Sequence, residues 1–191
     1  MATGISPYVP ADAETWDGLE NQKLLSQAEH YNRWIVRQVS PWAGRRILDA
    51  GCSIGNITRH WLDRDLVVAI ELLENSVRRV RERLGRHANL KIFAHDLSDP
   101  KVLELAHFGF DTITCFNVLE HVEADERGLA NFHALLQPGG HLLLLVPACL
   151  WLYGTLDRAE NHYRRYRPEE LRRKAIRAGF RIRRLYYMNF P

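Results

Sequence analysis

Two glycines, Gly51 and Gly55, follow a short apolar run in the first third of this 191-residue chain. The run Ile47-Leu48 is typical of a strand that is buried on both faces, and a helical pattern begins after the second glycine. Glycine tolerates positive φ and lets a ligand approach the backbone without meeting a Cβ. A strand, a glycine loop and a helix N-terminus together predict a cradle for an anion or a nucleotide.

Acidic residues end the next two predicted strands. Glu71 lies twenty residues after Gly51, where a carboxylate can accept hydrogen bonds from both hydroxyls of a ribose. Asp96 can accept a hydrogen bond from an exocyclic adenine amine, and the apolar neighbours Leu72 and Leu97 can cover the faces of the ring. These residues predict an adenosine-binding site.

The same loop could serve a dinucleotide instead. The dinucleotide pattern G-x-G-x-x-G needs glycine at positions 51, 53 and 56, where the chain has Gly51, Ser53 and Asn56. Because the first position alone matches, a nicotinamide-dependent oxidoreductase is the weaker interpretation. A doubly wound fold that binds no cofactor is a further alternative, and the combination of loop and acidic residues disfavours it.

The elements that must position these residues alternate between strands and helices. We expect strands at residues 45–50, 66–70, 90–94, 110–116, 141–146 and 180–188, and helices at residues 21–42, 56–63, 74–87, after 99, before 137 and at 167–179. Strands separated by such helices predict right-handed crossovers. The expected fold is therefore α/β, a Rossmann-like doubly wound, mainly parallel sheet with helices on both faces, and its ligands lie beyond the carboxyl ends of the strands.

The chain has the length of one domain. Residues 1–20 are expected to form a flexible N-terminal arm, without the features of a secretory signal. Residues 21–191 are expected to form a single domain, in which the helix at 21–42 packs against the core or acts as a lid. The stretch 148–167 shows no regular periodicity.

Composition argues against a membrane protein. The residues are 46% hydrophobic and 26% charged, and no apolar run approaches the roughly 18–20 residues that a membrane helix needs. The cysteines at 52, 115 and 149 are odd in number and lack metal or disulfide spacing. Free thiols in a reducing cytoplasm fit this pattern, so we expect a cytoplasmic location.

The net charge of +3 hides a local asymmetry. Residues 157–184 hold eleven Lys or Arg against four Asp or Glu. An anionic acceptor is one interpretation, and a solvated helix face is the commoner one. The aromatic residues of this stretch form no recognised stacking module, so no nucleic-acid partner is expected. The oligomeric state is not determined by these features.

The complete set of motifs resembles the class I S-adenosylmethionine-dependent methyltransferases, of the bacterial small-molecule type, over roughly residues 32–187. The segments that carry the resemblance are LDAGCSIG at 48–55, Glu71, HDL at 95–97, FDT at 110–112, NVLEHV at 117–122 and LQPGG at 136–140. The glycine loop alone would be weak support for this resemblance. The complete set, in the same order along nearly the whole chain, is strong support for it.

This resemblance implies roles for the loop. Asp49 would orient it and contact the methionine amino group of S-adenosylmethionine, directly or through water. Gly51 and Gly55 would let the loop pass beneath the cofactor. Ser53 departs from the family, because it replaces the usual middle glycine and restricts the backbone.

The resemblance also implies roles for the strand ends. Glu71 would hold the ribose and Asp96 the adenine amine, while Leu72 and Leu97 cover the ring. The backbone of Asn117 would face the methionine moiety. The implied cofactor is S-adenosylmethionine, with S-adenosylhomocysteine as its product.

His121 and His162 are the candidate catalytic residues. His121 follows the fourth predicted strand, and His162 lies in the stretch 148–167. A neutral imidazole could take a proton from a hydroxyl acceptor, although each histidine also has a simpler interpretation as a packing residue. The stretch 148–167 resembles a segment that covers the substrate in a bacterial branch of the family, so the substrate-side candidates are Tyr153, Asp157, His162, Arg165 and Tyr166. Asp157 could fix the ring tautomer of His162.

A metal ion is the alternative for this site. Family members that act on ubiquinone precursors or on small-RNA ends carry Glu-x-x-Glu-His and a later histidine, and here the first acid is Asn117. Glu120, His121 and His162 could still supply three ligands. Loss of one carboxylate lowers the charge that a magnesium-like ion prefers, so we expect no metal.

Family members usually insert an antiparallel seventh strand between the fifth and the sixth. This chain stops at Pro191, soon after its predicted sixth strand. We therefore expect the sheet to lack the last antiparallel strand, and the chain to be a shortened version of a longer protein with an under-paired edge.

The resemblance implies an enzyme that transfers the methyl group of S-adenosylmethionine to a small-molecule acceptor, at oxygen or nitrogen, by in-line displacement. A protein that binds the cofactor or its product without catalysis is the first alternative, and an NAD-dependent oxidoreductase is the second. The identity of the acceptor cannot be read from the sequence.

Overall fold

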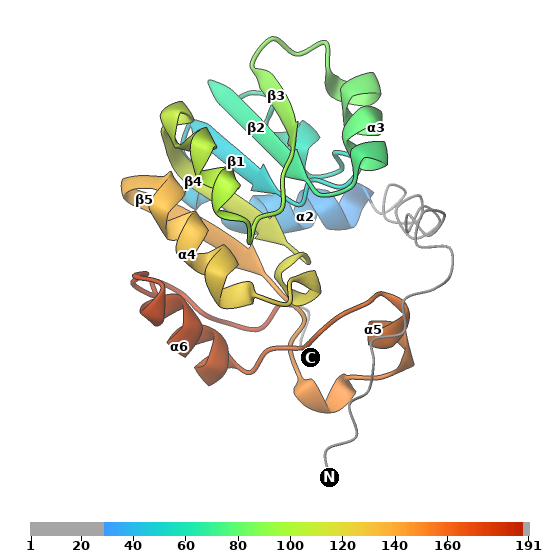
Figure 1. Cartoon of the computed structure of the whole chain (residues 1–191), viewed down its shortest axis with the longest axis vertical. Coiled ribbons are helices and arrows are strands. Elements are labelled where there is room, and N and C mark those ends of the chain that lie inside the picture. The colour runs from blue at the N-terminus through green and yellow to red at the C-terminus, as the bar shows by residue number, and fades with distance from the viewer. Residues whose placement is uncertain (1–28, 189–191) are drawn as a thin grey trace.

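A five-stranded parallel sheet forms the centre of the computed structural model, which describes residues 29–188. Its strands are β1 (Arg46–Ala50), β2 (Leu66–Glu71), β3 (Leu90–Ala94), β4 (Phe110–Phe116) and β5 (Leu136–Leu145). They lie in the order β3-β2-β1-β4-β5, and every neighbouring pair is parallel (Figure 1). The order reverses beside β1, which is the switch point where ligands bind in sheets of this type.

Helices connect the strands. The α-helices are α2 (Glu29–Val39), α3 (Glu74–Leu84), α4 (Asp125–Leu135), α5 (Thr155–Ala159) and α6 (Pro168–Arg177), and the 3₁₀ helices are η1 (Ser40–Trp42), η2 (Thr58–Trp61), η3 (Pro100–Phe108), η4 (Leu119–His121) and η5 (Leu150–Leu152). Within residues 29–188, no helix has both the length and the apolar character needed to cross a membrane.

Two apolar cores cover the two faces of the sheet. On one face, Ile47 of β1 packs with Val36 of α2 and Val80 of α3. On the other face, Leu48 packs with Phe132 of α4, with residues of η3 and with Tyr166. Side chains of a strand alternate between faces, so consecutive apolar residues serve both cores. This arrangement confirms the predicted doubly wound fold.

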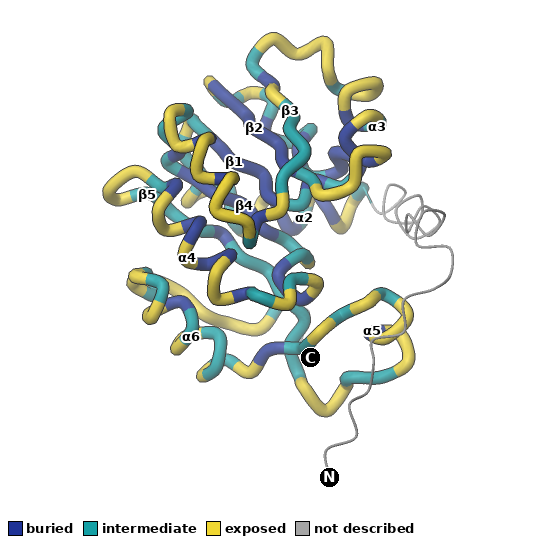
Figure 2. The backbone as a smooth tube through the Cα atoms, in the orientation of Figure 1, coloured by how far each residue is buried: buried dark blue, intermediate teal, exposed yellow. Residues whose placement is uncertain are grey.

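The central strands are buried along almost their whole length. In β1 and β2, every residue except the first of β1 and the last of β2 is buried (Figure 2). Continuous apolar runs are typical of parallel strands covered on both faces. The carboxyl ends of these strands are thereby held in fixed positions beneath the loops that follow.

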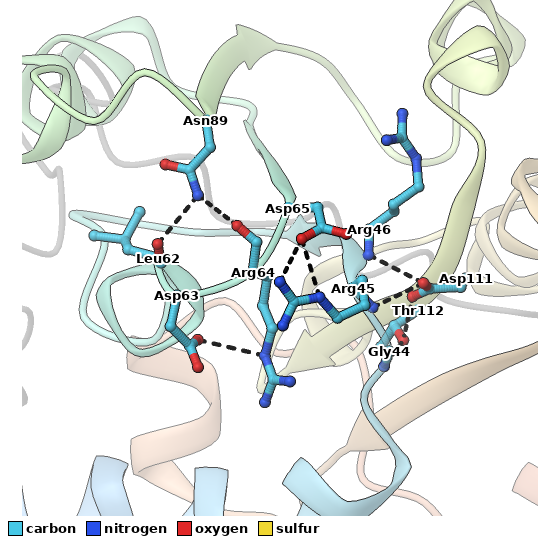
Figure 3. Close-up of polar contacts among 10 residues, drawn as sticks. All are labelled: Gly44, Arg45, Arg46, Leu62, Asp63, Arg64, Asp65, Asn89, Asp111 and Thr112. Carbon is cyan, nitrogen blue, oxygen red and sulfur yellow. Dashed lines mark hydrogen bonds and ion pairs between the residues drawn. The ribbon is translucent and has the colours of Figure 1, made fainter.

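Polar contacts join the amino ends of the strands, opposite the predicted site (Figure 3). The Asp111 carboxylate accepts hydrogen bonds from the backbone N–H of Arg45 at 2.8 Å and of Arg46 at 3.0 Å. The side chain of Arg45 in turn pairs with Asp65, just before β2. These contacts connect the starts of β1, β2 and β4.

The prediction of a sixth strand at residues 180–188 is wrong. Residues 180–188 form no strand, and Phe180, Ile182 and Leu185 instead line a cavity of about 1110 Å³ with β5, α2 and α6. Arginines interrupt the alternation of this segment, and β5 makes its ladder with β4 on one side only. Within the described residues, β5 is thus an edge strand, and the sheet contains no antiparallel strand.

Other elements also differ from the predictions. The helix predicted at 56–63 is reduced to the 3₁₀ helix η2. The turn predicted at 137–140 is part of β5, with a register shift against β4 after Phe110. The first helix is described only from Glu29, so residues 21–28 and the predicted arm at 1–20 lie outside the described residues.

Candidate functional site

The glycine loop leaves β1 at the carboxyl edge of the sheet. Gly51 has a φ of 74°, and a Cβ at this position would lie 2.3 Å from a methyl carbon of Val118. The N–H groups of Gly51 and Cys52 donate to the carbonyl of Ile70, at the end of β2. The loop is therefore packed between the ends of β2 and β4, and only glycine fits at its first turn.

Ser53 adopts a backbone conformation that favours glycine. Its φ is 52°, which lies in the left-handed region. Its backbone N–H donates a 2.8 Å hydrogen bond to Oε2 of Glu71. The serine thus holds a left-handed turn at a cost in conformational strain.

Glu71 lies where the sequence predicts it, at the end of β2, and its carboxylate holds the backbone around it. One oxygen accepts from Ser53, and the other accepts from the N–H groups of Leu72 and Leu73 at 2.9 and 3.3 Å. The residue remains partly exposed. A carboxylate oxygen has two lone pairs, so Glu71 can also accept from a ligand.

Asp49 is buried beneath the loop and is held by two threonines. Thr58 donates at 2.6 Å to one carboxylate oxygen, and Thr114 donates at 2.8 Å to the other. Burial raises the pKa of Asp49, and these two hydrogen bonds oppose that shift. Sequence reasoning missed both threonines. The alternation along β4 puts Thr114 on a buried face and was the available signal for it.

The remaining cofactor candidates differ in exposure. Leu72 is 62% exposed, whereas Leu97 is only 6% exposed and packs in the core beside Gly128 of α4. Asp96 is exposed, and its Oδ1 accepts from the N–H and the hydroxyl of Ser98. For covering an adenine ring, Leu72 thus has an open side chain, while Leu97 can offer only its backbone.

Asn117 follows β4 and lies between the predicted cofactor-binding residues and the candidate catalytic residues in the sequence. It is exposed, has a φ of 53° and donates its N–H to the carbonyl of Leu145. The next residue, Val118, contacts Gly51 in the way described above, and η4 then carries Glu120 and His121. The glycine loop and the candidate catalytic residues therefore lie at the same edge.

The structure brings the two candidate histidines together. The rings of His121 and His162 are 4.6 Å apart between centroids and nearly perpendicular, at 80°. The surrounding protein, and then the neighbouring His162 ring, lower the pKa of His121, although the residue as a whole is exposed. His121 is therefore neutral near pH 7 and is a weak proton acceptor.

Asp157 orients His162, as the sequence predicts. Its Oδ1 lies 2.9 Å from Nδ1 of His162 and accepts a 2.7 Å hydrogen bond from Nε of Arg165, while Oδ2 accepts from the N–H of Gly154. Burial alone would raise the pKa of Asp157, but these hydrogen bonds outweigh it and the pKa is lowered. The buried carboxylate therefore stays ionised and fixes the ring. The Tyr153 hydroxyl also donates, at 2.7 Å, to the His162 carbonyl.

Tyr166 and Arg165, two of the substrate-side candidates, have their polar groups engaged by the protein. The Tyr166 hydroxyl donates to Oδ2 of Asp125 at 2.8 Å, and burial raises the pKa of this tyrosine far above its usual range. Arg165 pairs with Asp157 as described above. Contact of either residue with an acceptor stays a prediction.

Glu120 is the residue that sequence reasoning undervalued. It is only 1% exposed, and its Oε2 has no hydrogen-bond partner among the described residues. Burial raises its pKa to about 8. Ligand atoms of Glu120, His121 and His162 all lie within 4.8 Å of one another. A carboxylate oxygen without a partner, beside two imidazoles, is a donor set that could hold a divalent cation. The expectation that the protein binds no metal therefore stays a prediction, and this donor set argues against it.

Comparisons with known proteins agree with this geometry. A family model described as a methyltransferase domain matches residues 48–142. A ubiquinone biosynthesis O-methyltransferase from Thiobacillus denitrificans (strain ATCC 25259 / T1) is 28% identical over 191 residues, which cover 92% of this chain and 81% of the relative.

Solved structures show the same fold. An S-adenosylmethionine-dependent methyltransferase from Mesorhizobium loti has a TM-score of 0.60 at 22% identity, over 75% of this chain and 77% of that one. The cyclase SpnF has a TM-score of 0.63 at 18% identity, over 79% of this chain but only 57% of the cyclase. Because the family match spans the strands that carry the glycine loop and both acidic residues, the chain belongs to the class I S-adenosylmethionine-dependent methyltransferases.

Proposed function

We propose that the protein methylates a hydroxyl oxygen of a small apolar acceptor. The observation that carries this proposal is the position of His162, which is oriented by Asp157 and packed against His121 at the edge of the sheet that carries the glycine loop. Methyl transfer forms the oxygen–carbon bond, breaks the sulfur–carbon bond and releases S-adenosylhomocysteine. The hydroxyl proton must leave at this point, and a group of imidazoles and a carboxylate can promote its removal.

Exposed apolar side chains support an apolar acceptor. In the stretch 148–167, Trp151 is 78% exposed, Leu152 is 49% exposed and Tyr163 is 51% exposed. Exposed apolar side chains gathered beside a site indicate a binding surface. By contrast, Arg164 and Arg165 pair with carboxylates of the protein. This part of the surface therefore favours an apolar acceptor over an anionic one.

The relative from Thiobacillus denitrificans supports oxygen as the methylated atom, since its name is that of an O-methyltransferase in ubiquinone biosynthesis. A phenol is an acceptor of this kind, because it combines an apolar ring with a hydroxyl. We infer that phenols are the first class of compound to test.

The decisive experiment is transfer of labelled methyl from S-adenosylmethionine into a panel of phenols, amines, sugars and lipids. We expect label in phenols, and we expect His162→Gln to reduce the rate by about 10²–10⁴-fold, the scale of proton-transfer catalysis. Glu82→Gln, on the exposed face of α3, is the matched control and should transfer normally. Label in amines alone, or in no acceptor, would contradict the proposal.

The two alternatives predict different binding. An oxidoreductase would bind NAD, and a non-catalytic protein would bind S-adenosylhomocysteine without transferring label to any acceptor. We expect tight binding of S-adenosylhomocysteine, no binding of NAD in calorimetric titrations, and transfer in the panel.

A further inference from the structure

Large apolar side chains lie exposed within the short segment 150–156, which we call the apolar tip. They are Leu150, Trp151, Leu152 and Leu156, with exposed fractions of 41%, 78%, 49% and 63%. Single exposed apolar residues are normal on a soluble protein, but a contiguous group marks a surface that contacts something other than water. The apolar tip is therefore a candidate contact surface.

The fold holds the apolar tip outward by fixing the backbone around it. The N–H of Leu152 donates to the carbonyl of Cys149 at 2.8 Å, and the Tyr153 hydroxyl donates to the carbonyl of His162 at 2.7 Å. The segment that carries η5 and α5 extends away from the sheet and is largely exposed (Figures 1 and 2). A surface held in this way loses little conformational freedom when it binds.

The exposed charges beside the apolar tip have one sign. Within residues 148–167, the exposed charged residues are Arg158 and Arg167. The two carboxylates of the same stretch both pair with ring nitrogens of His162, at 2.9 and 3.2 Å. An apolar surface with a cationic rim is complementary to an anionic bilayer, whose headgroups attract Lys and Arg.

The same charges argue against a second copy of the chain on this surface. In a two-fold symmetric contact each patch faces itself, so the cationic rims of two copies would repel each other. Trp and Tyr instead favour the boundary between lipid headgroups and hydrocarbon, because their apolar rings carry a polar N–H or O–H group. Trp151 in the tip and Tyr163, which is 51% exposed, supply such rings.

We propose that the apolar tip inserts into the surface of an anionic lipid bilayer. Because η5 and α5 have only three and five residues, the tip lies in the interface, about 5–10 Å deep, and does not span the membrane. This inference goes beyond the proposed function, since contact with lipid needs no methyl transfer. It also gives an apolar acceptor a source, because the tip is tied to His162 and the candidate site then lies at the bilayer surface.

Flotation of the full chain with lipid vesicles tests this contact without any methyl donor. We expect binding to vesicles that contain phosphatidylglycerol, and weaker binding to pure phosphatidylcholine or at high salt. Trp151→Ala and Leu156→Ala should each weaken binding at least about fivefold, because each removes a large apolar side chain from the inserted surface. Arg158→Gln should weaken binding to the anionic vesicles about fivefold and leave binding to phosphatidylcholine unchanged.

Ile176→Ala and Arg86→Gln are the matched controls, because each changes an exposed residue of the same kind outside the tip. Both should bind vesicles like the unaltered protein, and circular dichroism confirms that each variant is folded. Absence of binding to the anionic vesicles, or equal binding by Trp151→Ala, Leu156→Ala and the unaltered protein, would overturn the inference. A dimer that Trp151→Ala converts to a monomer in ultracentrifugation, without vesicle binding, would overturn it in favour of a contact between copies.

Labelled-methyl transfer on the same preparations distinguishes the two proposals. Transfer to phenols, together with absent vesicle binding, would leave the proposed function intact and remove the membrane contact. Vesicle binding without transfer to any oxygen acceptor would do the reverse.

Discussion

At the scale of single residues, Ser53 shows how a residue other than glycine is held in the left-handed region of the loop. A non-glycine residue in the left-handed region costs about 1–2 kcal/mol, and Ser53 accepts this strain at a φ of 52°. The hydrogen bond from its N–H to Glu71 fixes the same turn. The backbone path is therefore set by the surrounding contacts, and the residue type sets only its energetic cost.

Ser53→Gly should consequently stabilise the protein by up to about 1 kcal/mol. Glycine relieves the strain of the left-handed conformation, and this relief exceeds the cost of the added conformational entropy in the unfolded chain. Gly51→Ala should destabilise it by at least about 1 kcal/mol, because its Cβ would collide with Val118. Urea unfolding of both variants measures the two effects. Stabilisation by Gly51→Ala would show that the described loop is wrong.

Glu71 connects the loop to the cofactor at the same scale. Replacing it with alanine removes a hydrogen-bonding carboxylate, which should weaken binding of S-adenosylhomocysteine by about 1–3 kcal/mol. Calorimetric titration of Glu71→Ala measures the change, with Glu82→Ala as control. An unchanged dissociation constant would exclude contact between Glu71 and the ribose.

At the scale of elements, Asp125 joins three segments that are distant in sequence. It begins α4, and its Oδ2 accepts from Tyr166 at 2.8 Å, from Lys174 of α6 at 2.6 Å and from Arg164 at 2.8 Å. These contacts hold the stretch 148–167 against the sheet. They therefore help to place His162 beside His121.

Asp125→Asn should lower the free energy of unfolding by about 2–4 kcal/mol near pH 7, because it removes the buried carboxylate charge that the partly buried Lys174 and Arg164 share. Burial raises the pKa of Asp125, but the hydrogen bonds from Lys174, Arg164 and Tyr166 outweigh it, so the pKa is lowered. The folded protein then binds fewer protons here than the unfolded chain. The stabilisation is present above about pH 4 and is lost as pH falls through the lowered pKa.

Chemical unfolding at several pH values measures this difference. Glu126→Gln is the control, because Glu126 makes an exposed 3.8 Å pair with Arg177 between the same two helices. Exposed pairs contribute about 0–1 kcal/mol. A difference between Asp125→Asn and the unaltered protein that did not shrink below pH 4 would contradict the assignment.

At the scale of the whole molecule, the three cysteines differ in how far they are buried. Cys52 and Cys115 are buried, and burial raises the pKa of both thiols well above the usual value, whereas Cys149 is partly exposed. Since the thiolate is the reactive form, about one thiol per chain should react rapidly with Ellman's reagent in the folded protein. All three should react in urea, and Cys149→Ser should abolish the rapid phase. Rapid reaction of two thiols would show that the sheet is less closed than described.

Much of the fold could be predicted from local patterns. The strands around Ile47, Val67 and Ile113 are continuous apolar runs, so their existence and approximate limits follow from burial on both faces. The segment 180–188 misled the prediction, because its alternation lacked a partner strand. A strand depends on a neighbour that supplies its hydrogen bonds, and periodicity alone does not provide one.

The sequence by itself determined the order of strands and helices, the glycine loop and the acidic residues that end β2 and follow β3. These features are local, since each depends on residues close together in the chain. Only the tertiary structure decided that Glu120 is buried with an unmet oxygen and that Glu160 lies at His162. Some forty residues separate η4 from this end of α5, and packing through Asp125 and Tyr166 brings them together. Such convergence depends on how the layers pack, because the periodicity of one segment specifies its own conformation and not the distant residue that will face it.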